Sequence, residues 1–377
     1  MIDPVELSAE LIRCASVTPE EGGAIALLEK RLSEIGCAAT RCDRNGIANL
    51  YAKIGEGGPV FGFAGHTDVV PPGDPAEWTH PPFAGAVADG RLWGRGAVDM
   101  KSGVAAFVAA LAGWRASGGR GTVALLITGD EEGEAADGTV AILDWMKANG
   151  ERLDHCLVGE PTCPEMLGDM IKIGRRGSIT AHFTATGAQG HVAYPHRAAN
   201  PLPPLVRLLD RLASNELDKG TEHFDPSTLA LTTVDVGNPA TNVIPERARA
   251  TCNIRFNDAH TSRKLAMWML QEAAAASAGT GVRIETEFRV SGESFITEPG
   301  PLSDVISAAV EAETGRRPEL STSGGTSDAR FIRALCPVAE FGLVGQTMHK
   351  VDERAPVEEI RALSRIYRLV LDGYFSR

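Results

Sequence analysis

Five residues whose side chains can bind a metal ion are spread along the chain, each in a glycine-marked turn beside a short apolar run. They are His66, Asp99, Glu132, Glu160 and His349. Imidazole and carboxylate groups suit a two-zinc hydrolytic site, because each ion takes three or four nitrogen or oxygen ligands and keeps a position open for water. The sequence therefore predicts such a site if the fold brings these turns together.

His66 and Asp68 lie two residues apart after the apolar run VFGFAG. Alternate residues of an extended segment point to the same side. The Asp68 side chain can therefore accept the second imidazole N–H of His66 or lie just beneath the ring, which would fix the tautomer of a ligating histidine. The alternative is a loop histidine beside a turn aspartate, with no metal.

Asp99 follows two glycines in GRLWGRGAVDMKSG and precedes a helix expected to open near Ser102. Glycine allows the backbone to approach a ligand closely, and the two oxygens of a carboxylate here can bridge two ions. Taken alone, a helix N-cap is the simpler interpretation of Asp99.

The run ITGDEEGE places four carboxylates within five positions after an apolar strand. Glu131 and Glu132 are adjacent, so in a turn one can face a metal ion and the other a bound water. A general base beside a metal-activated water is the usual pairing for amide hydrolysis. A solvated acidic loop is the alternative, and Glu160 and His349 are each more often structural when taken singly.

The elements that must position these turns alternate between strand and helix, which predicts an α/β fold. Helices are expected over 5–14, 24–36 and 103–114, and apolar strands over 48–54, 60–64, 123–128 and 156–158. A helix over 302–314, a strand over 338–343 and a final helix over 357–374 follow near the end. This last part must fold back onto the first, because His349 belongs chemically with the other ligands.

From Gly177 the pattern changes to half-exposed strands separated by helices over 204–213 and 261–278. Strand, helix, strand, strand, helix, strand is the order of an α+β sandwich with helices on one face. We therefore predict a catalytic domain of residues 1–176 plus 290–377 and an inserted domain of residues 177–289, since 377 residues exceed one ordinary core.

Charge and composition exclude several classes of protein. The chain has 37 Lys and Arg against 49 Asp and Glu, a formal charge of −12, which disfavours long-range attraction to nucleic acid or an anionic membrane. No signal-like or membrane-spanning apolar run is present, so we expect a cytoplasmic protein. The 7 cysteines form no CxxC pair and are expected to be reduced core residues.

The ordered motifs GHTDVV, GRGAVDMKSG, GDEEGE, GEPT and MHKVDE, read with the insertion, resemble the dinuclear zinc aminoacylase and carboxypeptidase superfamily over nearly the whole chain. The resemblance implies that Asp99 bridges two zinc ions, with His66 and Glu160 on one ion and Glu132 and His349 on the other. Cobalt or manganese is possible at one site, because carboxylate-rich sites also suit these metals.

The same resemblance implies that Glu131 is the general base and acid and that Asp68 orients His66. It implies a cis peptide bond between Asp99 and Met100. The implied fold has a mixed central sheet flanked by helices and an inserted ferredoxin-like domain that acts as lid and dimerisation domain. In a homodimer of this kind, His191 of the partner subunit stabilises the oxyanion.

Within the superfamily, SGGTSDARFI, IKIGRRGS, GHVAYPH and PATNVIPE are similar to the succinyl-diaminopimelate desuccinylases, which release succinate from the amino group of a small dicarboxylic acid. Motif position then implies six substrate contacts: Lys172, Arg175, Tyr194, Asn242, Gly325 and Thr326. An arginine can clamp a carboxylate through two parallel hydrogen bonds, and a lysine acts as a point charge. The alternatives are an exposed basic hinge at KIGRRG and a surface turn histidine at position 191.

Two positions depart from the desuccinylase pattern, Ala329 where glycine is frequent and Gly345 where many desuccinylases carry asparagine. The departures leave open another N-acyl amino acid deacylase, such as an acetylornithine deacetylase or an aminoacylase. A catalytically silent scaffold that binds amino-acid-like ligands is the alternative from another functional class.

Overall fold

The computed structural model describes residues 2–376 and divides the chain into two compact units. Unit 1 comprises Met1–Ile173, Thr297–Ser321 and Ser327–Arg377, and unit 2 comprises Gly174–Ile296 and Thr322–Thr326. Unit 2 extends beyond the predicted 177–289 at both ends. The reason is a short antiparallel pair, β9 (Gly174–Arg175) with β16 (Phe295–Ile296), which joins the two ends of the insertion.

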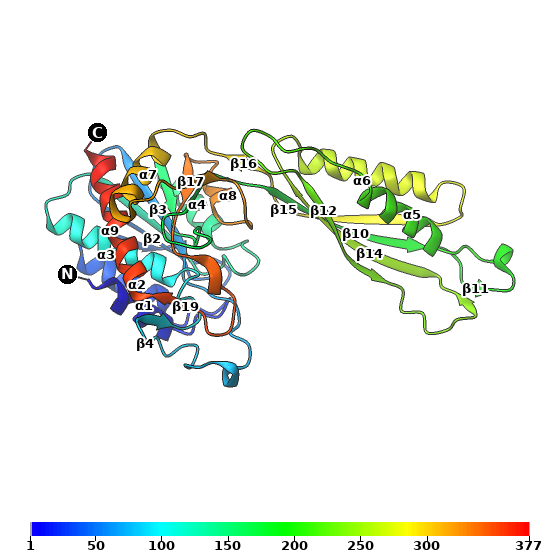
Figure 1. The fold of residues 1–377 in the computed structure, drawn as a ribbon, viewed down its shortest axis with the longest axis horizontal. Coiled ribbons are helices and arrows are strands. Elements are labelled where there is room, and N and C mark those ends of the chain that lie inside the picture. The colour runs from blue at the N-terminus through cyan, green and yellow to red at the C-terminus, as the bar shows by residue number, and fades with distance from the viewer. Residues whose placement is uncertain (1, 377) are drawn as a thin grey trace. The chain divides into compact units, whose positions relative to one another are not determined.

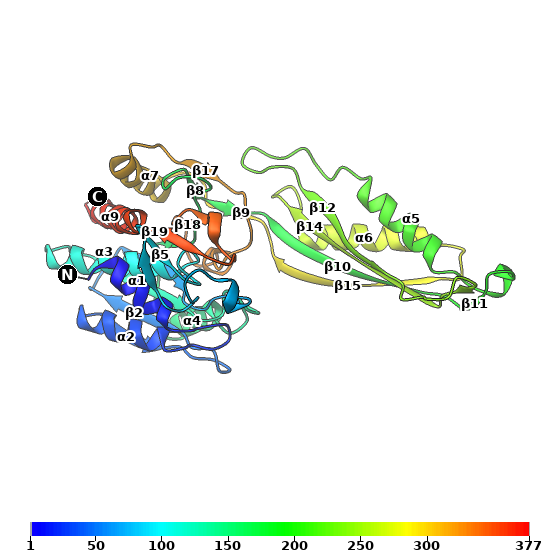
Figure 2. The same cartoon turned by 60° about the horizontal axis from the view of Figure 1, so that its bottom comes forward.

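An eight-stranded mixed sheet forms the centre of unit 1, as predicted (Figures 1 and 2). Its strands, in spatial order, are β1 (Ala38–Arg41), β2 (Leu50–Ile54), β6 (Thr122–Thr128), β3 (Val60–His66), β7 (His155–Val158), β18 (Val338–Glu340), β8 (Met170–Lys172) and β17 (Glu319–Ser321). The neighbours β6, β3, β7 and β18 run parallel to one another. Buried parallel strands read as continuous apolar runs, which is why these segments were visible in the sequence.

Helices flank this sheet. They are α1 (Pro4–Arg13), α2 (Ala24–Glu34), α3 (Lys101–Ala116), α4 (Thr139–Ala148), α7 (Pro301–Thr314), the short α8 (Ala329–Ile332) and α9 (Val357–Phe375). The small residues of α3 allow it to approach the sheet closely, since a Cβ on Gly103 would lie 2.6 Å from the oxygen of Gly159. Phe107 of α3 stacks on Phe63 of β3 with ring centroids 4.0 Å apart.

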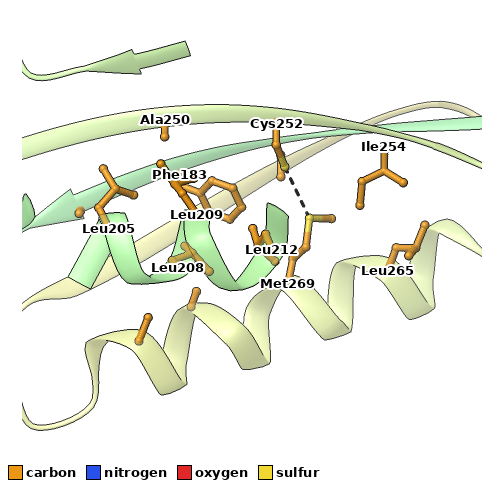
Figure 3. Packing of buried hydrophobic residues seen from close by; sticks show 14 of the residues in the cluster. Phe183, Leu205, Leu208, Leu209, Leu212, Ala250, Cys252, Ile254, Leu265 and Met269 are labelled. Carbon is orange, nitrogen blue, oxygen red and sulfur yellow. Dashed lines mark hydrogen bonds between the residues drawn. The ribbon is translucent and has the colours of Figure 1, made fainter. Parts of the chain in front are cut away.

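Unit 2 has the predicted ferredoxin-like order of elements. They are β10 (Gly177–Thr186), α5 (Leu202–Ala213), β12 (Thr228–Asp235), β14 (Arg247–Phe256), α6 (Ser262–Ser277) and β15 (Arg283–Gly292). The strands form an antiparallel sheet in the order β12-β14-β10-β15. Both helices cover one face, where leucines of α5 at helical spacing meet Phe183, Cys252 and Ile254 from the strands (Figure 3).

Several elements, most of them short, have no counterpart among the sequence predictions. Helix α4 is one, because an apolar run such as TVAILDWM fits a strand or a helix equally well. Others include the three-residue strands β4 (Ala86–Ala88), β5 (Arg91–Trp93) and β19 (Arg354–Pro356), which form a separate sheet. Three residues are too few to display a periodicity.

All seven cysteines are free, and all but Cys14 are buried, as predicted. Among residues 2–376, no helix is both long enough and apolar enough to cross a membrane.

Asp218 should stabilise the segment that leads into β12 of unit 2. Its carboxylate accepts hydrogen bonds from the amide of Gly220 (2.8 Å), the side chain of Asn257 (2.6 Å) and Nε2 of His260 (2.9 Å). Although burial opposes ionisation, hydrogen bonds from Ser227, Gly220 and Asn257 lower the pKa of Asp218 to about 2. Because this pKa lies below the ordinary value of 3.8, the stabilisation is present at neutral pH and is lost as pH falls through about 2.

We therefore expect Asp218→Asn to lower the local opening free energy by about 1.5–3 kcal/mol at pH 7, the usual contribution of hydrogen bonds to a charged group. Hydrogen exchange in peptides spanning 217–228 measures this change. The difference from the wild type should shrink below about pH 4. Asp258→Asn, at an exposed position next to Asn257 in sequence, is the matched control. Equal exchange in Asp218→Asn and the control would refute the role of Asp218.

Candidate metal centre and active site

The carboxyl ends of three parallel strands bring most of the predicted ligands to one edge of the sheet. His66 is the last residue of β3, Glu131 and Glu132 follow β6 by three and four residues, and Glu160 follows β7 by two. Adjacent parallel strands end at the same edge, where α/β proteins bind their ligands. Asp99 does not follow one of these strands but lies in the turn that leads into α3.

The first candidate group consists of His66, Asp99 and Glu160, whose ligand atoms lie within 4.8 Å of one another. Nε2 of His66 is 3.2 Å from Oδ1 of Asp99 and 3.8 Å from Oε1 of Glu160. All three residues are buried, with exposed fractions of 1%, 9% and 8%.

The second candidate group consists of Asp99, Glu132 and His349, again with ligand atoms within 4.8 Å of one another. Nε2 of His349 is 2.9 Å from Oε1 of Glu132 and 3.3 Å from Oδ2 of Asp99. Asp99 thus presents Oδ1 to the first group and Oδ2 to the second. The chain places the five residues in the arrangement that the superfamily resemblance implies, and the peptide bond between Asp99 and Met100 is cis, as predicted.

The orientation of His66 is set differently from the first expectation for Asp68. Nδ1 of His66 lies 2.9 Å from the backbone oxygen of Asp68, whereas the nearer carboxylate oxygen is 3.6 Å away. The Asp68 carboxylate instead accepts the amide N–H of Glu131 (3.2 Å) and of Glu132 (3.0 Å). The turn after β3 directs the Asp68 carbonyl at the His66 ring. The Asp68 carboxylate is therefore free to position the backbone of Glu131 and Glu132.

The residues of this centre fit cations. With Nδ1 of His66 donating to a carbonyl, Nε2 carries the lone pair and faces two carboxylates, as a ligating imidazole does. Burial raises the pKa of Glu160 well above its ordinary value, and the nearby Asp99 and Glu131 carboxylates raise it further. Burial likewise raises the pKa of Glu131 to about 8. Buried carboxylates crowded in this way ionise together only when positive charge offsets them.

Three of the four carboxylates of the acidic run, Asp130, Glu131 and Glu132, have separate places in the structure, so the run is not a solvated loop, whereas Glu134 is exposed. Asp130 is buried and accepts the amides of Ala136 (2.9 Å) and Asp137 (3.0 Å), which closes the turn that carries Glu131 and Glu132. Arg44 also stabilises this turn, because its Nε donates a hydrogen bond of 2.8 Å to Oδ1 of Asp137. Asp130 thus has a structural role that was not foreseen.

Lys172 and Arg175 are buried, with exposed fractions of 6% and 9%, so the alternative of an exposed basic hinge is wrong for these two residues. Lys172 belongs to β8 in unit 1, and its Nζ lies 3.5 Å from Oγ of Ser321. Arg175 belongs to unit 2, where a Cβ on Gly324 would lie 2.6 Å from its Nη1.

Thr326 and Gly325 lie in the short second segment of unit 2. Oγ1 of Thr326 is 3.4 Å from Nη1 of Arg255, a residue not assigned a role from the sequence. Burial, together with the neighbouring Arg176 guanidinium, lowers the pKa of Arg255. Unit 2 therefore gathers closely spaced arginines in a chain that is acidic as a whole.

His191, Tyr194 and Asn242 come together in a second part of unit 2. Strand β11 (Gly190–His191) pairs with β13 (Val243–Ile244), and the amide of Val192 donates to the oxygen of Asn242 at 3.2 Å. The rings of His191 and Tyr194 have centroids 5.8 Å apart. All three predicted residues are exposed.

The two departures from the desuccinylase pattern have different surroundings. Ala329 is the first residue of α8 and its backbone does not have positive φ, so glycine is not required there. At Gly345 a Cβ would meet Sδ of Met348 at 3.4 Å and the oxygen of Pro161 at 3.5 Å, so a side chain would fit but is absent.

Comparison with known proteins places the chain in a family. Residues 62–373 match the model of peptidase family M20/M25/M40. The chain is 64% identical over 378 residues to a succinyl-diaminopimelate desuccinylase of Cereibacter sphaeroides, covering 100% of both chains. The chain belongs to peptidase family M20/M25/M40. The family resemblance inferred from five short motifs is thereby confirmed.

Solved structures of other M20 proteins share the fold. A metallo-carboxypeptidase of the M20 family from Sulfolobus solfataricus superimposes with a TM-score of 0.79 at 16% identity, over 99% of both chains. A dinuclear metal-binding M20 peptidase from Bacillus subtilis gives a TM-score of 0.74 at 17% identity, over 99% of this chain and 98% of that one. At such identities the likeness concerns the fold alone.

Proposed function

We propose that this M20 family member is a metal-dependent hydrolase that cleaves the amide of N-succinyl-LL-2,6-diaminopimelate to succinate and LL-2,6-diaminopimelate, a step of lysine biosynthesis. One observation carries the proposal: two candidate metal groups share Asp99 beside Glu131, in a chain 64% identical along its full length to a named desuccinylase.

The metal centre would contain two divalent cations per subunit, zinc at both sites or cobalt or manganese at one. His66, Asp99 and Glu160 would bind one cation, and Asp99, Glu132 and His349 the other. When bound, such ions activate water and polarise the amide carbonyl.

Glu131 would transfer the proton in this reaction. It lies beside the ligand Glu132, and Asp68 fixes its backbone through a hydrogen bond of 3.2 Å. Its carboxylate would take the proton of the attacking water as the new C–O bond forms at the succinyl carbonyl. The same proton would then pass to the leaving nitrogen as the C–N bond breaks, which frees the amine and succinate.

The substrate is a polycarboxylate, and the positive side chains described above support its binding. We propose contacts from Lys172, Arg175, Tyr194, Asn242, Gly325 and Thr326. The guanidinium groups near Thr326 favour carboxylate recognition, because an arginine can make two parallel hydrogen bonds to one carboxylate. A net charge of −12 makes such local positive charge necessary for an anionic substrate.

We also propose that the chain forms a homodimer through unit 2 and that His191 of the partner subunit supports the oxyanion of the tetrahedral intermediate. Strand β12 supports dimerisation, because it is an edge strand with Leu231 40% and Val234 55% exposed. Exposed edges of this kind commonly pair with another chain.

Mixing two inactive variants tests this arrangement. Glu131→Gln lacks the base and His191→Ala lacks the oxyanion donor, so a hybrid dimer should contain one complete site. We expect mixing to restore up to about a quarter of wild-type activity once subunits exchange, since half of the dimers are hybrids. If subunits exchange, as native mass spectrometry can show, and activity stays at the level of the separate variants, His191 acts within its own subunit or not at all.

The purified chain with added zinc tests the function itself. We expect release of succinate from N-succinyl-LL-2,6-diaminopimelate to exceed release of acetate from N-acetylornithine and from N-acetyl amino acids. Faster acetate release would identify another deacylase of the family, for which Gly345 gives a specific reason. Hydrolysis of none of these amides by metal-loaded protein would indicate a silent scaffold.

A further inference from the structure

Glu353 is a fully buried carboxylate that belongs to neither candidate metal group. It lies four residues after His349 and directly before β19. Although it stands in the motif MHKVDE, neither the motif's metal chemistry nor the proton transfer by Glu131 uses it.

Both oxygens of Glu353 accept hydrogen bonds from the turn that leads to Asp99. Oε1 accepts the amides of Val98 (2.8 Å) and of Asp99 itself (3.1 Å). Oε2 accepts the amide of Gly96 (3.0 Å) and Nη1 of Arg95 (2.8 Å). Three backbone amides and one guanidinium thus converge on a single side chain.

This turn needs an acceptor from elsewhere in the chain. Gly96 has a φ of +85°, which bends the backbone so that successive amides point to one side. Val98 and Asp99 are buried, with exposed fractions of 2% and 9%, so their amides cannot rely on water. A buried amide without a hydrogen-bond partner destabilises the fold. Glu353 supplies the acceptors from a segment more than 250 positions away in sequence.

Glu353 also connects two ligand segments. Its own backbone oxygen accepts the amide of Gly94 at 2.9 Å, and Arg95 donates a further bond to the oxygen of Lys350 at 3.1 Å. The segment after His349 is thereby joined to the turn before Asp99 at several points. His349 and Asp99 belong to the same candidate metal group.

Asp68 makes the same kind of contact with another ligand segment. Its carboxylate accepts the amides of Glu131 and Glu132, just as Glu353 accepts the amide of Asp99. In each case a buried carboxylate from one ligand segment fixes the backbone of a ligand in another. A neutral acceptor could satisfy the same amides, but a carboxylate also adds negative charge, which favours bound cations.

We propose that Glu353 is a positioning residue of the metal centre, which fixes the backbone of Asp99 relative to His349 so that the shared carboxylate faces both cations. The inference rests on the metal centre of the proposed function. A merely structural role would predict a loss of folding stability alone, whereas positioning predicts weaker metal binding by protein that remains folded.

Two substitutions at position 353 test the proposal in the full chain. Glu353→Gln keeps the shape but places an NH₂ group against N–H donors, and Glu353→Asp keeps the charge but withdraws it by about 1.5 Å. Circular dichroism first establishes that the metal-free variant is folded. Titration calorimetry with zinc should then show dissociation constants raised about 10–100-fold for both ions, because Asp99 belongs to both metal groups. If Glu353→Gln does not fold, Glu353→Asp alone decides the test.

Asp352→Asn is the matched control, because the neighbouring Asp352 carboxylate binds Thr79 (2.7 Å to its amide) instead of the Asp99 turn. The control should bind zinc like the wild type. Zinc affinity within twofold of wild type in a folded position-353 variant would overturn the positioning role, whatever its thermal stability. Absence of zinc binding by the wild type would instead refute the metal centre and with it the proposed function.

Discussion

Glu131→Gln should retain both metal ions and lower kcat by about 10²–10⁴-fold, the usual contribution of a general acid–base group. Retention is expected because Glu131 belongs to neither candidate metal group. Loss of turnover is expected because an amide cannot take the proton of the attacking water. Burial and the neighbouring Asp328, Glu132 and Asp99 carboxylates raise the pKa of Glu131 to about 8, against the effect of His66, so the side chain has an affinity for protons suited to this role.

The measurement combines steady-state kinetics with metal analysis by inductively coupled plasma mass spectrometry. Glu134→Gln is a matched control, since Glu134 is an exposed carboxylate of the same turn and its replacement should leave kcat nearly unchanged. A kcat for Glu131→Gln within tenfold of the wild type would remove Glu131 from the proton transfer. Loss of metal would show instead that Glu131 is a ligand.

Replacing Asp99 should affect both metal ions, whereas replacing His349 should affect chiefly one. Asp99 is the one residue shared by the two groups found in residues 2–376, with Oδ1 toward His66 and Oδ2 toward His349. We therefore expect Asp99→Ala to bind less than one equivalent of zinc and to have almost no activity. His349→Ala should keep the ion bound by His66, Asp99 and Glu160.

Stoichiometry after dialysis against a weak chelator distinguishes these outcomes. His80→Ala, at a histidine outside both groups, controls for the loss of an imidazole. Equal metal content in Asp99→Ala and His349→Ala would contradict the shared role of Asp99. Circular dichroism of both metal-free variants must match the wild type for the comparison to hold.

Much of the fold was predictable because long helices and strands carry a clear pattern of apolar residues. The parallel strands β3 and β6 are fully buried, so they appear in the sequence as uninterrupted apolar runs. Helix α5 displays its leucines at helical spacing because one face packs on the sheet of unit 2. Short strands such as β5 and β19 carry no such signal, yet they fix the turn before Asp99 and the segment after His349.

The candidate site was predictable to the level of residue types. His66, Glu132 and Glu160 stand at or just after the ends of buried strands, and the order of the five ligand motifs along the chain predicts the family. Glu353 and Asp328 were missed, although both stand in motifs that had been noted. Asp328 is buried and its Oδ2 accepts the hydroxyl of Thr139 at 2.7 Å. A single carboxylate in a motif does not reveal from which distant hydrogen-bond donors it will accept.

By itself, the sequence determined the chemistry available to this protein: two imidazoles and four carboxylates, of which His66, the glutamate pair and Glu160 stand at or just after the ends of buried strands. Only the tertiary structure decided which atom performs each task. The carbonyl of Asp68 orients His66 while its carboxylate fixes the glutamates, and Glu353 fixes Asp99 across 254 positions. The physical reason is that strand ends follow from local apolar patterning, whereas hydrogen-bond partners depend on where distant turns meet.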